Sequence, residues 1–254
     1  MAANETNQFS GGLTLMEHLS ELRDRLVKSA WAVLIMTMIC WAFHTQLFDA
    51  LRGPIASQLQ GGGLVFTHPI DKFMAHLKVS LFAGIVLACP VWLYQAWMFV
   101  APGLYAHEKK YSIVFIASGT ILFLVGVAFA YFLVLPTAFN FLLNFGGTID
   151  KPMITITEYL SFFVTMTLVF GFAFELPLVI VVLGAIGIVD QKMLREKRRI
   201  MIVVLAVVSA IVTPPDILSM LLLFVPLWFL YEISILLVGM IGKRKKTPSQ
   251  TPLQ

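Results

Sequence analysis

Long apolar segments, more than any single motif, constrain what this chain can fold into. We place six of them, separated by short polar stretches, at residues 26–48, 73–100, 111–135, 156–188, 200–213 and 217–241. A transmembrane helix needs about 20 predominantly apolar residues to cross a hydrocarbon core of about 30 Å. Outer-membrane strands would instead give alternating segments of about ten residues. The pattern therefore predicts an all-α polytopic membrane protein with six transmembrane helices in a single membrane domain.

Composition argues against the soluble alternatives. Hydrophobic residues make up 59% of the 254 residues and charged residues only 13%, whereas about a quarter of a soluble domain is charged. An ordinary cytosolic enzyme and a disordered regulator are excluded on this ground. Cys40 and Cys89 are isolated in apolar segments, and the five histidines lack the spacing of metal ligands. We therefore expect no metal site, no cofactor and no enzyme activity.

The positions of the lysines and arginines predict the orientation. Fourteen of the 18 fall on one side of the six-segment topology, at residues 23–28, 109–110, 192–199 and 243–246. Short cytoplasmic loops carry an excess of Lys and Arg, so both termini are expected in the cytoplasm. Residues 1–25 then form a cytoplasmic amphipathic segment, and residues 242–254 form a cytoplasmic tail.

Prolines and segment lengths predict irregular helices. Pro90 and Pro177 lie inside the second and fourth segments, and Pro54 and the Pro214–Pro215 pair mark turns. The fourth segment is about 50 Å long as a helix, so it must tilt, kink or project from the bilayer. The fifth segment is only about 21 Å long, which is too short to cross an undistorted bilayer.

A few carboxylates are not explained by topology. Glu21 lies in an amphipathic helix that is either a solvated interfacial helix with intrahelical ion pairs or an acidic face that binds a basic ligand. Glu108, beside two lysines, belongs either to a topology-setting charge cluster or to a binding site. Glu175 lies in mid-segment, where a carboxylate costs a few kcal/mol. It must face a cavity, find a partner or carry a proton, unless it is a protonated or hydrogen-bonded packing residue.

Short motifs in these regions resemble the TatC family, the integral-membrane receptors of the twin-arginine protein translocase. They occur in the family's order across nearly the whole chain and are specific in combination. The motifs are His18-Leu-Ser-Glu-Leu-Arg-Asp-Arg25, Tyr94-Gln95-Ala-Trp97, Phe99 to Pro102, Leu104-Tyr-Ala-His-Glu108, Ala128-Phe-Ala-Tyr131, Phe174-Glu175-Leu-Pro177 and Thr213-Pro-Pro-Asp216.

The resemblance implies a cup-shaped bundle whose last two helices are short, and binding of twin-arginine signal peptides at the cytoplasmic face. The family's two recognition glutamates match Glu21 and Glu108. The same region includes Arg23, Arg25 and Phe99. Two basic positions after the loop glutamate, arginines in some relatives, are Lys109 and Lys110 here, which keep the charge but lose the planar fork of arginine.

The resemblance also implies partners and a location. Folded precursor proteins with twin-arginine signal peptides, single-span TatA- and TatB-like subunits, membrane lipids and further copies of the chain are expected partners, whereas nucleic acid is not. The location is the bacterial cytoplasmic (inner) membrane, and the proton-motive force drives export. Intramembrane polar or partner contacts are expected at Glu175, Thr213, Asp216 and Tyr131. Met220 replaces a glutamine that some members carry.

Two rival functions remain open from the residues alone. A secondary transporter could couple a small solute to protons through Glu175, but such folds are built from internal repeats, and none is visible. An intramembrane enzyme would need a nucleophile–base pair or a metal set. The receptor hypothesis suits the carboxylates better, because a carboxylate binds a guanidinium group through two parallel hydrogen bonds.

Overall fold

The computed structural model describes residues 15–56, 63–100, 112–145, 153–213 and 216–245. Within these ranges the chain is helical, and the sole extended pairing is an isolated parallel bridge between Val65 and Thr155. The helices are α1 Leu15–Trp41, α2 His44–Leu51, α3 Gly53–Ala56, α4 Asp71–Leu87, α5 Cys89–Val100, α6 Ser112–Phe129, α7 Leu135–Asn144, α8 Ile156–Ala173, α9 Leu176–Ile186, α10 Gln191–Glu196, α11 Arg198–Val212 and α12 Ile217–Lys245.

Three helical stretches are long and apolar enough to cross a membrane. They are Ile113–Asn144, Ile156–Ile186 and Ile217–Met240, and two bent pairs of helices raise the number to five if each pair is one span. The fifth predicted segment corresponds to α11, whose 15 residues span about 22 Å. The chain is therefore an all-α polytopic membrane protein, and the count of six spans stays a prediction.

The first helix differs from the sequence prediction. A separate amphipathic segment and a span at residues 26–48 were expected, but α1 is one helix that ends at Trp41 and meets α2 at a bend of 91°. The amide groups of Ala42 and Phe43 donate to carbonyls three residues earlier, which tightens the last turn. Polar His44, Thr45 and Gln46 begin α2, but they lie within an otherwise apolar stretch, so the hydropathy of residues 26–48 did not separate the two helices.

The third predicted segment is too short at its C-terminal end. The sequence prediction ended this segment at residue 135, yet the helix continues as α7 to Asn144. A π-helical segment, Ala130–Val134, ends two residues before Pro136. A wider turn relieves the clash that a proline ring makes with the carbonyl four residues earlier. The Thr137 hydroxyl donates to the Leu133 carbonyl at 2.7 Å, which satisfies one exposed acceptor.

The prediction that both of the last helices are short is wrong for α12. Helix α12 has 29 residues and contains Pro226 without a break in the helix. The Asp216 side chain starts it, since Oδ1 accepts the Ser219 N–H at 2.6 Å. Packing of α12 against both α9 and α11 then supports its length.

The other prolines stand near helix starts. Pro90 is the second residue of α5, which is bent by 53° from α4, and Pro177 is the second residue of α9. Pro54 is the second residue of α3. This position suits proline because the first amides of a helix have no intrahelical partner. Pro214 and Pro215 lie outside the described residues.

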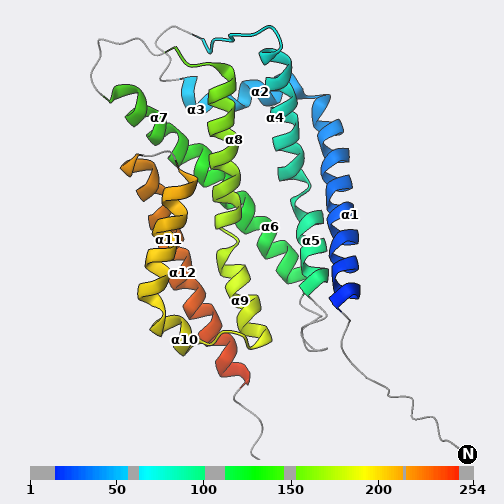
Figure 1. Ribbon diagram of the computed structural model, residues 1–254, viewed down its shortest axis with the longest axis vertical. Helices are drawn as coiled ribbons and strands as arrows, with labels where there is room; N and C mark the ends of the chain where they lie inside the picture. Colours follow the sequence, from blue (N-terminus) through cyan, green and yellow to red (C-terminus); the bar gives the residue numbers. More distant parts are fainter. Residues whose placement is uncertain (1–14, 57–62, 101–111, 146–152, 214–215, 246–254) are drawn as a thin grey trace, which may run out of the picture.

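Figure 1 shows the arrangement of the bundle. Helix α1 lies beside α4 and α5, while α6 and α7 run diagonally behind α8, and α12 pairs with α9 and α11. The start of α1, the end of α5, the start of α6, α10 and the end of α12 lie at the lower end in this view. The upper end contains α2, α3 and the starts of α4 and α8. The segments with most lysines and arginines therefore share one end of the molecule.

Helices α1 and α4 approach each other at backbone distance. A Cβ atom at Gly84 would lie 2.3 Å from Thr37 Oγ1 and 2.8 Å from the Thr37 backbone nitrogen. No real side chain fits at such distances, so glycine is required for this crossing. The central core lies beside this crossing, where Phe82 of α4 packs on Phe163 of α8 and where Tyr159, Phe163 and Phe170 are almost completely buried.

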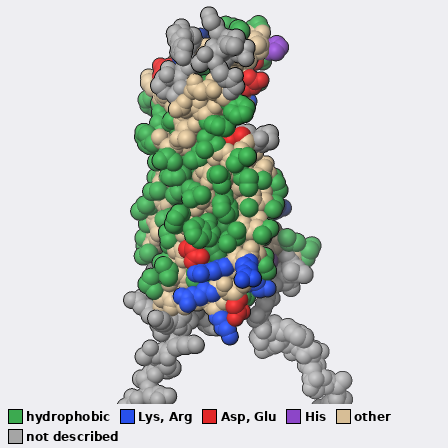
Figure 2. Space-filling model, turned by 90° about the vertical axis from the view of Figure 1, so that its left-hand side faces the viewer, with side chains coloured by type: hydrophobic (Ala, Val, Ile, Leu, Met, Phe, Trp, Pro, Cys, Tyr) green, Lys and Arg blue, Asp and Glu red, His purple; other side chains and the backbone are tan. Residues whose placement is uncertain are grey.

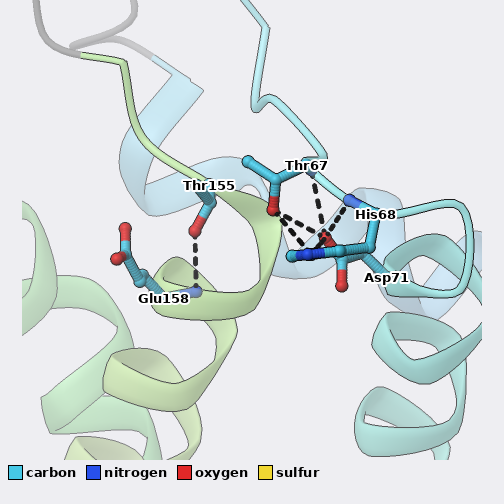
Figure 3. Close-up of polar contacts among 5 residues, drawn as sticks. All are labelled: Thr67, His68, Asp71, Thr155 and Glu158. Carbon is cyan, nitrogen blue, oxygen red and sulfur yellow. Dashed lines mark hydrogen bonds and ion pairs between the residues drawn. The ribbon is translucent and has the colours of Figure 1, made fainter.

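Polar contacts fasten the upper end (Figure 3). Asp71 Oδ2 accepts hydrogen bonds from the Thr67 N–H at 3.1 Å, the Thr67 hydroxyl at 3.1 Å and the His68 N–H at 2.9 Å. Nearby, the Thr155 hydroxyl accepts the Glu158 N–H at the start of α8. The loop before α4 is joined to the start of α8 because the Val65 backbone bonds to the strand-like residues around Thr155.

Candidate functional site

The lower part of α1 brings a carboxylate and a guanidinium together in a partly buried position. Arg25 donates from Nη2 at 2.6 Å and from Nε at 3.0 Å, and both bonds end on Glu21 Oε1. The Glu21 side chain is 24% exposed and the Arg25 side chain 18%. Their four-residue spacing places them on one face of the helix. The ion pair is therefore more shielded from water than an ordinary surface pair.

Helix α5 completes this site from the other side. The Gln95 carbonyl oxygen accepts a hydrogen bond of 3.4 Å from Arg25 Nη1. The rings of His18 and Phe99 stack, with centroids 4.4 Å apart and planes inclined by 21°. We name Glu21, Arg25, Gln95, His18 and Phe99 together the α1–α5 site. It contains an acidic group, an aromatic surface and a polar side chain at one end of the bundle.

The structure does not bring every predicted residue into this site. Arg23 pairs with its neighbour Asp24 at 3.2 Å, and these side chains are 78% and 60% exposed. Arg23 therefore lies on the solvent side of α1. Glu108 and Lys109 lie outside the described residues.

Two members of the α1–α5 site were not singled out from the sequence. Gln95 and His18 belong to the motifs that carry the family resemblance, but no role was assigned to either. A glutamine in a highly apolar helix was the available signal for Gln95. Nothing in the local sequence could pair His18 with Phe99, because that contact depends on how α1 crosses α5.

Glu175 lies at the break between α8 and α9 and is only 7% exposed. Neither of its carboxyl oxygens accepts a hydrogen bond from the described part of the chain. A Cβ at Gly119 would be 3.3 Å from Glu175 Oε2 and close to Leu93 and Leu178 as well. The carboxyl group therefore points into the interior between α6 and α9, where the absence of a side chain at Gly119 makes room for it.

The other predicted intramembrane residues have contacts within the protein. Thr213 donates to the Ser209 carbonyl of its own helix at 2.8 Å. Asp216 caps α12 through Oδ1, while its Oδ2 atom is buried without a partner among the described residues. Tyr131 donates at 2.7 Å to the Ala50 carbonyl near the end of α2. This hydroxyl therefore ties the π-helical segment to the upper end.

The described residues contain no group of three or more His, Cys, Asp or Glu side chains that could hold a metal ion. Cys40 and Cys89 are both buried and unpaired with each other. The α1–α5 site offers charge, hydrogen bonds and an aromatic face.

The long apolar helices place this chain in the class of polytopic integral membrane proteins, and the partly buried Glu21–Arg25 pair is its candidate site. The family described as "Sec-independent protein translocase protein (TatC)" matches residues 17–226. The chain belongs to the TatC family.

Individual relatives agree over almost the full length. The chain is 41% identical to the Sec-independent protein translocase protein TatC of Desulforapulum autotrophicum, over 92% of this chain and 87% of that protein. It is 39% identical to the TatC protein of Aquifex aeolicus, over 94% of this chain and 99% of that protein. The crystal structure of a twin-arginine translocase receptor TatC superposes with a TM-score of 0.78 at 38% identity, covering 89% of this chain and all of that chain.

Proposed function

We propose that this protein is the core receptor subunit of a twin-arginine translocase, which binds the signal peptides of folded precursor proteins at the α1–α5 site. Membership of the TatC family supports the assignment. The observation that carries the site is the partly buried Glu21 carboxylate, which already holds a guanidinium group through two hydrogen bonds. The geometry of the site therefore suits arginine.

An incoming arginine has two ways to bind at Glu21. Both bonds from Arg25 end on Oε1, and among the described residues Oε2 accepts none, so Oε2 is the proposed acceptor for a second guanidinium group. Alternatively, the incoming arginine displaces Arg25, which then keeps its bond to Gln95. Lysine fits less well in either case, because its ammonium carries its three donors on one nitrogen and lacks the planar fork of a guanidinium group.

The second arginine of the motif is assigned to Glu108, nine residues beyond Phe99 in the chain. Lys109 beside it would set the local charge. Phe99 and His18 offer a stacked aromatic face that suits the apolar residues flanking a twin-arginine pair. Arg23 is left with a peripheral role, because its side chain is largely exposed and paired with Asp24.

The orientation follows from the clustering of cations at the lower end. We propose that this end faces the cytoplasm, with both termini inside and the protein in the bacterial inner membrane. Single-span TatA- and TatB-like subunits and further copies of the chain are the proposed partners within the membrane, and the proton-motive force drives export. Glu175, Thr213 and Asp216 are proposed to meet partner helices, which requires Glu175 to leave its buried position.

Site-specific photo-crosslinking tests the binding site. A photoreactive residue is placed at Phe99 in the intact protein, which is reconstituted in a bilayer and incubated with a twin-arginine signal peptide or its twin-lysine counterpart. The expected result is a crosslink to the twin-arginine peptide that is several-fold weaker for the twin-lysine peptide. The same probe at Asp24, on the exposed side of α1, is the matched control. Equal crosslinking at both positions, or to both peptides, would remove the assignment.

A further inference from the structure

The turn from α10 into α11 carries a dense group of cations that the proposed peptide site does not use. Lys192, Arg195, Lys197 and Arg199 are all exposed, and we name these four the α10–α11 corner. Arg198 between them is different, because its Nη2 atom donates to Glu232 on α12 at 2.6 Å. One cation therefore fixes the start of α11, and four remain at the surface.

The corner stands on a firmly held scaffold. Leu194 of α10 is buried, and its carbonyl accepts a hydrogen bond of 2.7 Å from the Tyr231 hydroxyl of α12. Asp190 caps α10 by accepting the Met193 N–H at 2.6 Å. Gln191 packs so closely on Gly239 that a Cβ there would lie 2.3 Å from its amide nitrogen. The cations are thus positioned by helix packing and do not hang from a loose loop.

Local acidic groups leave most of the positive charge uncompensated. The Asp190 carboxylate is engaged in the cap, and Glu196 reaches Lys192 only at 4.0 Å with both side chains strongly exposed. Such exposed pairs contribute little and are screened by salt. The corner therefore presents a net positive surface to whatever lies beside it.

What lies beside it is an apolar helix face. The exposed apolar side chains of α11 beyond the corner include Ile200, Val203, Val204, Val207 and Ile211. Figure 2 shows this side of the molecule, with Lys and Arg side chains gathered at the lower end beneath a largely hydrophobic surface. A cationic surface directly below an apolar one matches a phospholipid, whose phosphate and acyl chains have the same order.

We infer that the α10–α11 corner binds the headgroup phosphates of anionic phospholipids in the adjacent leaflet. Helix α11 strengthens the inference because its 15 residues cover about 22 Å, less than the hydrocarbon thickness of about 30 Å. A short span draws the headgroup layer toward the protein at its ends. Anionic lipids are favoured there because four exposed cations meet their phosphates at close range.

Lipid retention by the purified protein tests this inference. The full chain is extracted from membranes containing phosphatidylglycerol and phosphatidylcholine, and bound lipid is measured by mass spectrometry. We expect Arg195→Gln/Lys197→Gln to lower the ratio of phosphatidylglycerol to phosphatidylcholine at least threefold. The matched control is Arg23→Gln/Lys28→Gln, which removes the same charges from exposed positions of α1 and should leave the ratio unchanged.

A charge-preserving variant keeps the test decisive if the glutamine variant fails to fold. Arg195→Lys/Lys197→Arg retains both cations and should retain the lipid, with loss of binding in 0.5 M salt. Equal lipid ratios in the glutamine pair and the parent protein would overturn the inference, as would loss of the lipid in the charge-preserving variant. These readouts do not involve the signal peptide, so failure here leaves the proposed receptor function standing.

Discussion

The polar side chains at the two ends of the bundle differ in how many hydrogen bonds they make within the protein. At the upper end, Asp71 Oδ2 accepts three hydrogen bonds from Thr67 and His68, and the Tyr131 hydroxyl donates to a backbone carbonyl. In the α1–α5 site, Glu21 uses one oxygen for Arg25, and within the described part of the chain one 3.4 Å bond from Arg25 to Gln95 is the hydrogen bond between side chains of the two helices. The hydrogen bonds at the upper end stabilise the fold. The Glu21 carboxylate can accept further hydrogen bonds, as the proposed binding of a ligand requires.

Reversing the charge of Glu21 should have the largest effect on function. We expect Glu21→Lys to reduce export of a twin-arginine reporter by at least about 100-fold, because losing one partner of a shielded charge pair costs more than about 3 kcal/mol. The protein should still accumulate in the membrane. Asp24→Lys, three residues away on the exposed side, is the control and should export normally.

The same change at Glu108 tests the second half of the recognition hypothesis. Glu108→Lys is expected to abolish export to a similar degree, about 100-fold, since two arginines require two carboxylates. Export is measured as processed reporter outside the cytoplasm. Normal export by this variant would leave Glu21 as the sole recognition carboxylate.

Removing a hydroxyl at the upper end should affect stability and leave export intact. Tyr159 donates to the Leu51 carbonyl in a buried position, so Tyr159→Phe leaves that acceptor unpaired. A loss of about 1–3 kcal/mol in unfolding free energy is expected, measured by denaturant titration in detergent. A large export defect without a stability change would contradict the structural role of this end.

Asp71→Ala should have a smaller effect at the same end. It removes the acceptor for the Thr67 and His68 amides at the start of α4, which costs about 1 kcal/mol by analogy with other lost helix caps. A fall in thermal stability of the purified protein, with unchanged crosslinking at Phe99, is the expected outcome. Asp49→Ala, an exposed neighbour in α2, provides the reference for simple charge loss.

The smallest expected effect concerns Arg25. Replacing it with lysine keeps the charge but removes the two-point contact with Glu21, so signal-peptide affinity should change by only roughly three- to tenfold. The direction discriminates between the two binding modes. Tighter binding means that the incoming arginine displaces Arg25, and weaker binding means that Arg25 orients Glu21 for it.

Much of this molecule could be predicted from patterns along the chain. Helix-length apolar runs indicated a polytopic all-α protein, and the motif around Glu21 indicated the family to which the chain belongs. The spacing of Glu21 and Arg25 already predicted their ion pair, because residues four apart share a helix face. Features of this kind depend on neighbours in sequence, and a single chain contains them.

Features that depend on packing could not be read in this way. The bend after Trp41 lies inside a stretch that is apolar enough as a whole to be taken for one span. A proline usually ends a helix, but the π-helical turn before Pro136 allows the helix to continue past it. Gln95 joined the α1–α5 site only through the crossing of two helices, and Tyr131 turned out to bind the Ala50 carbonyl.

The close crossing of Gly84 and Thr37 has a mechanical consequence. Because a Cβ at Gly84 would clash with the backbone of Thr37, the two helices approach closely there, and α1 cannot slide along α4 without a steric clash. Helix α1 carries Glu21 in its lower part, and α4 begins at the Asp71 contacts of the upper end. A pull on Glu21 along α1 would therefore be passed to α4 at this crossing.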